Sequence, residues 1–211
     1  MKAVTVLRLA KDHDLSADIV PEVYLKCQAI REFDYPWLAH TFERQLTEVR
    51  IAWTDKYLYV HQWAKDSWIV AKETKAKGKV YEDDCLEIFV SPDASGSYFG
   101  WEINANGVLL EYLAQGWGEG PVEQKHFDYH WKSAAQSKMR RHDAGFVVET
   151  RIPWAKDFGK IPRRGDSWRA TFNRIDVDRQ SRTSLSTWSG LDPGSPVWFH
   201  QPEGFGQIVF G

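Results

Sequence analysis

Short apolar and polar runs alternate from Glu48 to the end of the chain, and Gly, Pro, Asn and Asp break them at short intervals. This period of two is typical of antiparallel strands, whereas the longer period of helices is absent. The runs 49–53 and 57–61, for example, flank the polar break Thr54-Asp55-Lys56, which suits a tight hairpin. The pattern therefore predicts an all-β fold with little helix.

Turn residues set further strand boundaries. Asn106-Gly107 can supply the positive φ angles of a hairpin turn, and Pro153 ends a run because it cannot donate to a sheet ladder. Residues 153–165 are expected to form an irregular crossover with at most one helical turn. The remaining strands are expected at 4–9, 85–90, 98–104, 108–113, 137–142, 146–152, 168–177, 184–188 and 207–210. This spacing favours a single antiparallel β-sandwich, jelly-roll-like, over residues 1–211.

Charge and hydropathy exclude several classes of protein. The formal net charge is −2 at pH 7, so no overall positive field exists to bind nucleic acid or an anionic membrane. No run approaches the ~20 apolar residues of a membrane span. The start of the chain lacks the apolar region of a secretory signal, so a cytoplasmic location is expected, or a secreted one if a signal has been removed. Cys27 and Cys85 are too few for a disulfide framework and are expected to be free thiols.

Aromatic residues are abundant, with 11 Trp, 8 Tyr and 11 Phe. A buried Trp needs a partner for its indole N–H, so a surplus of Trp in a polar chain suggests that some rings line a binding surface. Packing is nevertheless the ordinary role of a Trp in a strand. That role is expected for Trp53, Trp63, Trp101, Trp154 and Trp168. The loop residues Trp37, Trp117 and Trp198 stay undecided.

Several segments, in order, resemble the carbohydrate-binding modules of family 9. The first, 81–90, has an aromatic residue, then Asp84, then Glu87-Ile88-Phe89. The others are 101–107, 148–154, 165–176, 186–189 and 200–206. An ordered series is far more specific than one short motif. The resemblance covers about 49–211 and leaves residues 1–48 as an N-terminal segment packed on the domain.

The resemblance implies a β-sandwich that holds the end of a sugar chain between two facing aromatic residues, which match Tyr81 and Trp188. It also implies that Glu87 and Asn104 hydrogen-bond sugar hydroxyls, with Asn173 bordering the same face. Glu102 stands where the resemblance leads us to expect a basic residue, which bears on the choice of sugar. Some family members bind structural calcium, and such modules commonly serve a carbohydrate-active enzyme.

The residues themselves support such a site, because a pyranose needs flat apolar platforms for its faces and polar groups for its hydroxyls. Period two places Glu87 on the face of its strand opposite Leu86, Ile88 and Val90. It places Glu102 and Asn104 on one face of the next strand. The alternative is that Glu87 and Glu102 are solvated or pair with Arg169 or Arg174 across the sheet.

The sequence also offers alternatives to sugar binding. Asp83, Asp84, Glu87 and Glu102 are close in sequence, so a glycoside hydrolase, or an accessory subunit of a carbohydrate-active enzyme, is the main rival. Related sandwich domains of the DOMON type hold haem, for which Met139 is the only internal methionine. His126 and His130 have metal-pair spacing, but Gly120-Pro121 upstream indicates a loop. No common catalytic motif is present, and non-catalytic sugar binding is preferred.

Overall fold

The computed structural model describes residues 1–37, 43–93, 95–116, 126–195 and 197–211. Within these ranges the chain forms twelve strands and almost no helix. The strands are β1 Ala3–Arg8, β2 Thr47–Trp53, β3 Tyr57–Lys65, β4 Cys85–Ser91, β5 Tyr98–Asn104, β6 Leu109–Gln115, β7 His126–Asp128, β8 Gln136–His142, β9 Gly145–Pro153, β10 Ser167–Val177, β11 Thr183–Thr187 and β12 Gly206–Phe210. The helical turns are η1 Glu22–Tyr24, η2 Val80–Glu82, η4 Trp154–Phe158 and η5 Pro202–Gly204. None of the helices described could cross a membrane.

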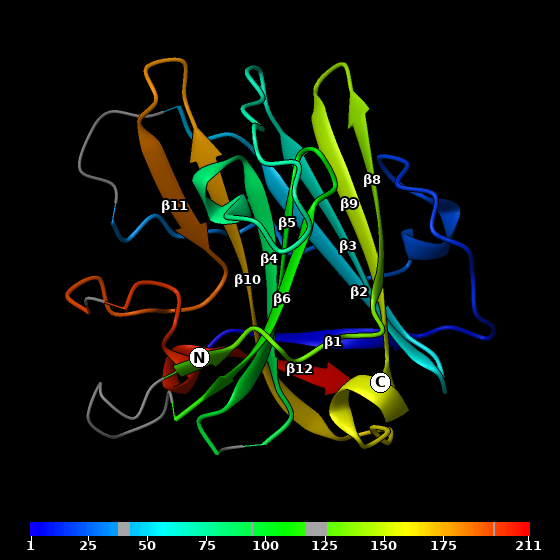
Figure 1. Ribbon diagram of the computed structural model, residues 1–211. Coiled ribbons are helices and arrows are strands. Elements are labelled where there is room, and N and C mark those ends of the chain that lie inside the picture. The colour runs from blue at the N-terminus through cyan, green and yellow to red at the C-terminus, as the bar shows by residue number, and fades with distance from the viewer. Residues whose placement is uncertain (38–42, 94, 117–125, 196) are drawn as a thin grey trace.

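The strands join into one curled, mixed sheet (Figure 1). Its order is β7-β6-β5-β4-β10-β12-β1-β2-β3-β9-β8, and β11 pairs with β10 off this path. β1 connects the two halves: its first residues run parallel to β12, and its last two, Leu7 and Arg8, run parallel to β2. β1 and β12 cross the direction of the other strands in Figure 1. The sheet can curl because one short strand changes partner along its length.

The predicted all-β fold and its strands are confirmed, with two corrections. The sheet is not purely antiparallel, because β1 lies between β12 and β2 and runs parallel to both. Residues 126–128, expected in a loop, form the short strand β7, which pairs with β6. The crossover after β9 contains the single turn η4, as predicted. Gly107 has a φ of 78°, as the hairpin turn before β6 requires.

A central core fills the space inside the curl. Both halves of the sheet contribute to it, for example Ile51 and Val60 from one half and Ile88 and Phe172 from the other. Trp53, Trp101, Trp154 and Trp168 are all buried in this core, which confirms their predicted packing role. Trp63 in β3 is only partly buried. Met139, the residue of the haem hypothesis, packs against the same core.

A second apolar cluster covers the other face of β4, β5, β6 and β10. It includes Cys85, Phe89 and Tyr112. Tyr112 lies across Gly100 of β5, and a Cβ on that glycine would lie 2.5 Å from the Tyr112 ring. Gly100 therefore provides the room for Tyr112 on this face.

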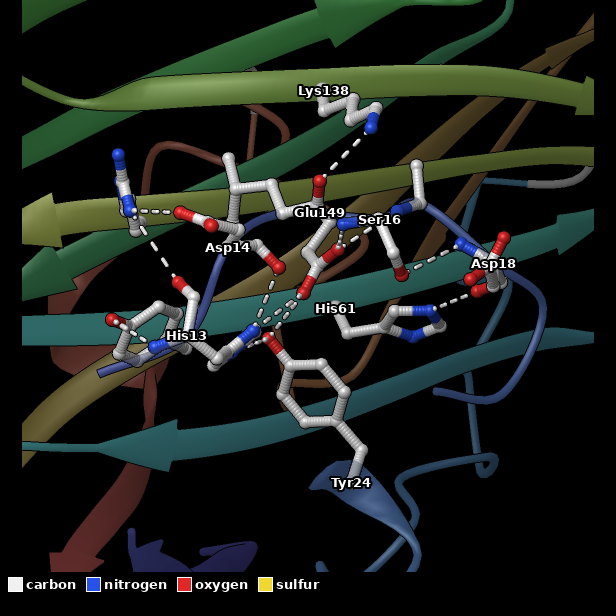
Figure 2. Close-up of polar contacts among 12 residues, drawn as sticks. His13, Asp14, Ser16, Asp18, Tyr24, His61, Lys138 and Glu149 are labelled. Carbon is white, nitrogen blue, oxygen red and sulfur yellow. Dashed lines mark hydrogen bonds and ion pairs between the residues drawn. The ribbon is translucent and has the colours of Figure 1, made fainter. Parts of the chain in front are cut away.

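The N-terminal segment is fastened to β9 by one buried carboxylate, that of Glu149 (Figure 2). Glu149 Oε2 accepts hydrogen bonds from the backbone N–H groups of Ser16, at 2.7 Å, and Ala17, at 2.8 Å. Its other oxygen, Oε1, accepts one from the Tyr24 hydroxyl at 2.9 Å. The His13 imidazole lies 3.7 Å from the same oxygen. Both oxygens of this carboxylate are thus occupied by donors of the chain itself.

Further contacts hold the same segment. His61 Nε2 lies 2.8 Å from the backbone oxygen of Asp18, and His142 Nε2 lies 3.0 Å from that of Ala17. Lys138 donates to the backbone oxygen of Leu15 at 3.0 Å. Residues 13–18 are therefore held against β3, β8 and β9 by specific hydrogen bonds.

Candidate functional site

An aromatic pocket of about 750 Å³ opens on the face that carries the second apolar cluster. Seven of the described residues around it bear aromatic rings: Trp37, Tyr81, Tyr112, Phe127, Tyr129, Trp198 and Phe199. Three carboxylates, those of Glu82, Glu87 and Glu102, also line it, while no Lys or Arg does among these described residues. The pocket thus combines apolar rings with hydrogen-bond acceptors, and its size suits a small organic ligand.

Glu87 and Glu102 form the deepest polar part of this pocket. The sheet register sets Glu102 of β5 directly opposite Glu87 of β4, and Asn173 of β10 opposite Glu87 on its other side. Both glutamates are almost fully buried, with 2% and 4% of their surface exposed. The alternative, that they are solvated or paired with arginine, is wrong: Arg174 binds Asp66 and Asp176, and Arg169 donates to backbone oxygens.

The hydrogen bonds of the two glutamates leave one acceptor open. Asn173 Nδ2 donates to Glu87 Oε2 at 3.1 Å, and the Tyr112 hydroxyl donates to Glu102 Oε1 at 2.7 Å. Glu102 Oε2 is buried and has no hydrogen-bond partner in the part of the chain that the structure describes. Such an orphan acceptor is costly in a folded protein and is a place where a ligand can donate.

The two carboxyls favour a protonated form. Burial raises the pKa of Glu102 to about 7, against the smaller lowering effect of the Tyr112 hydrogen bond. Burial, and then the charge of Glu102, raise the pKa of Glu87 well above its ordinary value. Burial and their mutual repulsion disfavour the ionised forms, so the two neighbouring carboxyls tend to keep at least one proton near neutral pH. The pair can then both donate to a ligand and accept from it.

Three large rings at the pocket are exposed to solvent. Tyr81 in η2, Tyr129 after β7 and Trp198 before η5 expose 42%, 44% and 55% of their surface. Trp198 has a φ of +50°, a left-handed conformation that non-glycine residues rarely adopt. Strained residues of this kind cluster at functional sites. These rings offer flat apolar platforms above the buried carboxyls.

His200 contributes a neutral ring to the pocket wall. Its Nδ1 lies 2.5 Å from the Tyr98 hydroxyl, and its ring stacks on Phe89 with centroids 5.5 Å apart. Burial lowers the pKa of His200 to about 4, so the imidazole carries no charge near neutral pH. It therefore does not offset the negative charge of the glutamate pair.

Three of the six site residues predicted from the sequence line this pocket: Tyr81, Glu87 and Glu102. Asn173 does not line it but binds Glu87, so it orients that carboxyl. Their contacts with a ligand remain predictions.

Asn104 lies outside the pocket, and its amide is fully used within the protein. Its nitrogen donates to the backbone oxygen of Glu73 and to Asp83 Oδ2, at 3.0 and 2.8 Å. Its oxygen accepts from the backbone N–H groups of Asn106 and Val108. Asn104 thus ties the segment before η2 to the turn after β5, which leaves no hydrogen bond for a sugar.

Trp188 is not brought together with Tyr81, contrary to the facing pair that the sequence predicted. Its side chain is only 4% exposed and belongs to the central core, where its ring lies 5.6 Å from that of Phe172. A Cβ on Gly206 would lie 2.8 Å from the Trp188 ring, so the absence of a side chain there makes room for it. The physical reason is packing: the ring fills the core beside β12.

Two residues that line the pocket, Trp198 and Tyr129, were not among the site residues predicted from the sequence. Trp198 and Trp37 were undecided loop residues, and their clustering with Tyr81 depends on the folding of three loops that are distant in sequence. Trp117, also undecided, lies outside the described residues. The high Trp content was the one signal that pointed to such a surface.

Among the residues that the structure describes, two groups of side chains have the proximity that a metal ion needs. The first, Cys85, Glu87 and Glu102, has its ligand atoms within 4.8 Å of one another. Burial raises the pKa of the Cys85 thiol well above its ordinary value, so this thiol is protonated in the metal-free protein.

The second group, Asp66, Asp84 and Asp176, has the oxygen donors that calcium prefers. These carboxylates already have partners within the protein. Arg174 binds Asp66 and Asp176, and both oxygens of Asp84 accept hydrogen bonds from backbone N–H groups. Structural calcium therefore does not fit this group as it stands, and it remains an expectation from the family resemblance.

Sequence comparison matches residues 19–211 to a family model described as carbohydrate family 9 binding domain-like. The match begins upstream of the segment that showed the resemblance and takes in most of the N-terminal region. No curated protein matches the chain at a significant level.

Three solved structures have a similar fold. A protein from Bacteroides uniformis ATCC 8492, proposed to bind carbohydrate, has a TM-score of 0.79 at 20% identity, covering 100% of this chain and 99% of that one. A carbohydrate binding module of family 9 from Caldicellulosiruptor kristjanssonii, in complex with glucose, has a TM-score of 0.70 at 17% identity, with 100% and 96% covered. A family 9 module from the same organism, in complex with cellotriose, has a TM-score of 0.68 at 17% identity, with 99% and 93% covered.

Proposed function

The chain belongs to the carbohydrate family 9 binding domain-like family, and we propose that it binds a saccharide in the aromatic pocket without performing a reaction on it. One observation carries the proposal: exposed rings stand over a buried row of polar side chains. Tyr81, Tyr129 and Trp198 supply faces for stacking, while Glu87 and Glu102 supply hydrogen bonds for hydroxyls. The solved relatives with glucose and cellotriose support this class of ligand.

The fold suits such a role. We propose that the curled sheet is a jelly-roll-like β-sandwich, because its two halves pack their apolar faces on one core. The outer face of one half is then free to carry the pocket. A carbohydrate-active enzyme is the partner that such a module would hold near its substrate.

The arrangement of the carboxyls supports binding over hydrolysis. A glycosidase needs two carboxyls on opposite sides of the scissile bond, one protonated and the other ionised. Glu87 and Glu102 lie side by side in one row on neighbouring strands, so both approach a ligand from the same side. Stacking and hydrogen bonding need no such opposition.

Calorimetric titration with glucose and cellotriose, followed by chromatography of the mixtures after long incubation, tests the proposal. Saturable binding with unchanged saccharides is expected. New reducing ends would make the glycoside hydrolase the better explanation, and the absence of binding to any saccharide would contradict the proposal.

A further inference from the structure

We propose that the pocket prefers a saccharide that carries a protonated amine, that is, a hexosamine, over the corresponding neutral sugar. The inference rests on the proposed function and names the ligand class of the same site. It follows from three properties of the pocket: its uncompensated carboxyls, its orphan acceptor and its aromatic wall.

The two buried carboxyls of the pocket, Glu87 and Glu102, have no cationic partner among the described residues. None of the ion pairs found in those ranges includes Glu87 or Glu102. Arg169, a cation on the same strand as Asn173, donates to the backbone oxygens of Pro202 and Glu203, both at 3.3 Å. Without a counter-charge these buried carboxyls favour the protonated form, and a ligand that brings a positive charge would stabilise the ionised form that the protein itself does not stabilise.

The open acceptor specifies where that charge would act. Glu102 Oε2 has no donor in the described structure, although the side chain is only 4% exposed and lines the pocket. A hydroxyl could donate one neutral hydrogen bond to it. An ammonium group donates a charge-assisted one, which is roughly twice as strong.

The pocket wall favours a cation for a separate reason. The face of an aromatic ring is electrically negative and attracts ammonium groups. Seven aromatic rings of the described chain surround the pocket, and the neutral His200 adds no repulsion. The volume of about 750 Å³ is far larger than a bare ion and leaves room for a sugar ring that carries the amine.

Calorimetric titration of the whole chain with glucosamine, glucose and N-acetylglucosamine at neutral pH tests the inference. Glucosamine is expected to bind at least ~10-fold more tightly than glucose, which corresponds to ~1.4 kcal/mol. N-acetylglucosamine carries its nitrogen at the same ring position as glucosamine, but as an uncharged amide. It should therefore bind no more than ~2-fold more tightly than glucose.

Two variants locate the effect. Glu102→Gln keeps the shape of the side chain and should reduce the preference of glucosamine over glucose to about 2-fold or less. Glu82→Gln is the matched control, since Glu82 also lines the pocket but pairs with Lys79 at the surface. It should change the preference by less than ~2-fold.

The outcomes separate the two proposals. Binding of glucose and cellotriose without preference for glucosamine would overturn the inference and leave the proposed function intact. An equal loss of preference in Glu82→Gln and Glu102→Gln would also overturn it, because general surface charge would then explain the effect. No binding of any saccharide would contradict the proposed function itself.

Discussion

Glu149 and Glu102 are both buried carboxyls on β-strands, yet their surroundings differ. Glu149 accepts two backbone N–H groups and the Tyr24 hydroxyl, so both of its oxygens are occupied by the chain. Glu102 accepts only the Tyr112 hydroxyl among the described donors, and its second oxygen is open. A buried polar group that the protein satisfies serves the fold, whereas an unsatisfied one that lines a pocket, as Glu102 does, is available to a ligand. Glu149, with Ser16, Ala17 and Tyr24, therefore forms a structural contact that we call the clasp, whereas Glu102 belongs to the candidate binding site.

The largest effect is expected at the clasp. Glu149→Leu leaves Ser16, Ala17 and Tyr24 with buried donors that have lost their acceptor, and each such group costs ~1–3 kcal/mol. The free energy of unfolding in urea should fall by about 5 kcal/mol in total. Sugar affinity should stay unchanged, because the clasp residues do not line the aromatic pocket. A loss of stability below ~1 kcal/mol would show that Glu149 does not hold the N-terminal segment on β9.

Trp188→Ala extends the comparison to aromatic residues. Trp188 is buried in the central core, so its removal leaves a cavity and should lower the free energy of unfolding by ~3–5 kcal/mol. Saccharide affinity, measured by titration of the folded variant, should change little. A large loss of affinity with normal stability would restore Trp188 to the binding site.

Tyr81→Ala should give the reverse result. Its ring is 42% exposed on the pocket wall, so a lost stacking platform should weaken saccharide binding by ~1–3 kcal/mol. Stability should change by no more than ~0.5 kcal/mol. Unaltered affinity in calorimetry would remove Tyr81 from the site.

The remaining effect, of about the same size as that of Tyr81→Ala, concerns Glu102 itself and has the opposite sign from that at Glu149. Burial raises the pKa of Glu102 in the folded protein to about 7. As the pH rises, the glutamate of the unfolded chain therefore ionises before that of the folded protein. The wild-type protein thus loses stability as the pH rises from the ordinary pKa of a glutamate to about 7. Glu102→Gln cannot ionise and should gain ~1–3 kcal/mol at alkaline pH relative to wild type.

Urea unfolding across this pH range measures the difference. Five titratable groups lie near Glu102 and either titrate with it or remain neutral beside it: Cys85, Glu87, Tyr98, Tyr112 and Tyr129. Parallel pH profiles for the two proteins would contradict the role assigned to Glu102.

Local patterns predicted the strands and the direction of their side chains. Period two correctly set Leu86, Ile88 and Val90 toward the central core and Glu87 toward the other face. It could not show that the second face is also covered, because the covering rings come from loops far away in the chain. The glutamates therefore proved to be buried, where the sequence left them solvated as an alternative.

Trp188 and Asn104 show why the remaining site residues could not be assigned from the sequence. Trp188 lies just past the end of β11, and its direction depends on Gly206, which lies beside it in the core. Asn104 is saturated by the segment that contains Glu73 and Asp83, whose path no periodicity reveals. Both placements depend on contacts between distant parts of the chain.

A crystal structure of the protein with a bound saccharide tests the central claim most directly. The sugar ring should lie in the aromatic pocket on Tyr81 or Trp198, with a donor of the sugar within hydrogen-bond distance of Glu102 Oε2. A sugar bound elsewhere, with the pocket empty and Glu102 Oε2 still without a partner, would contradict it.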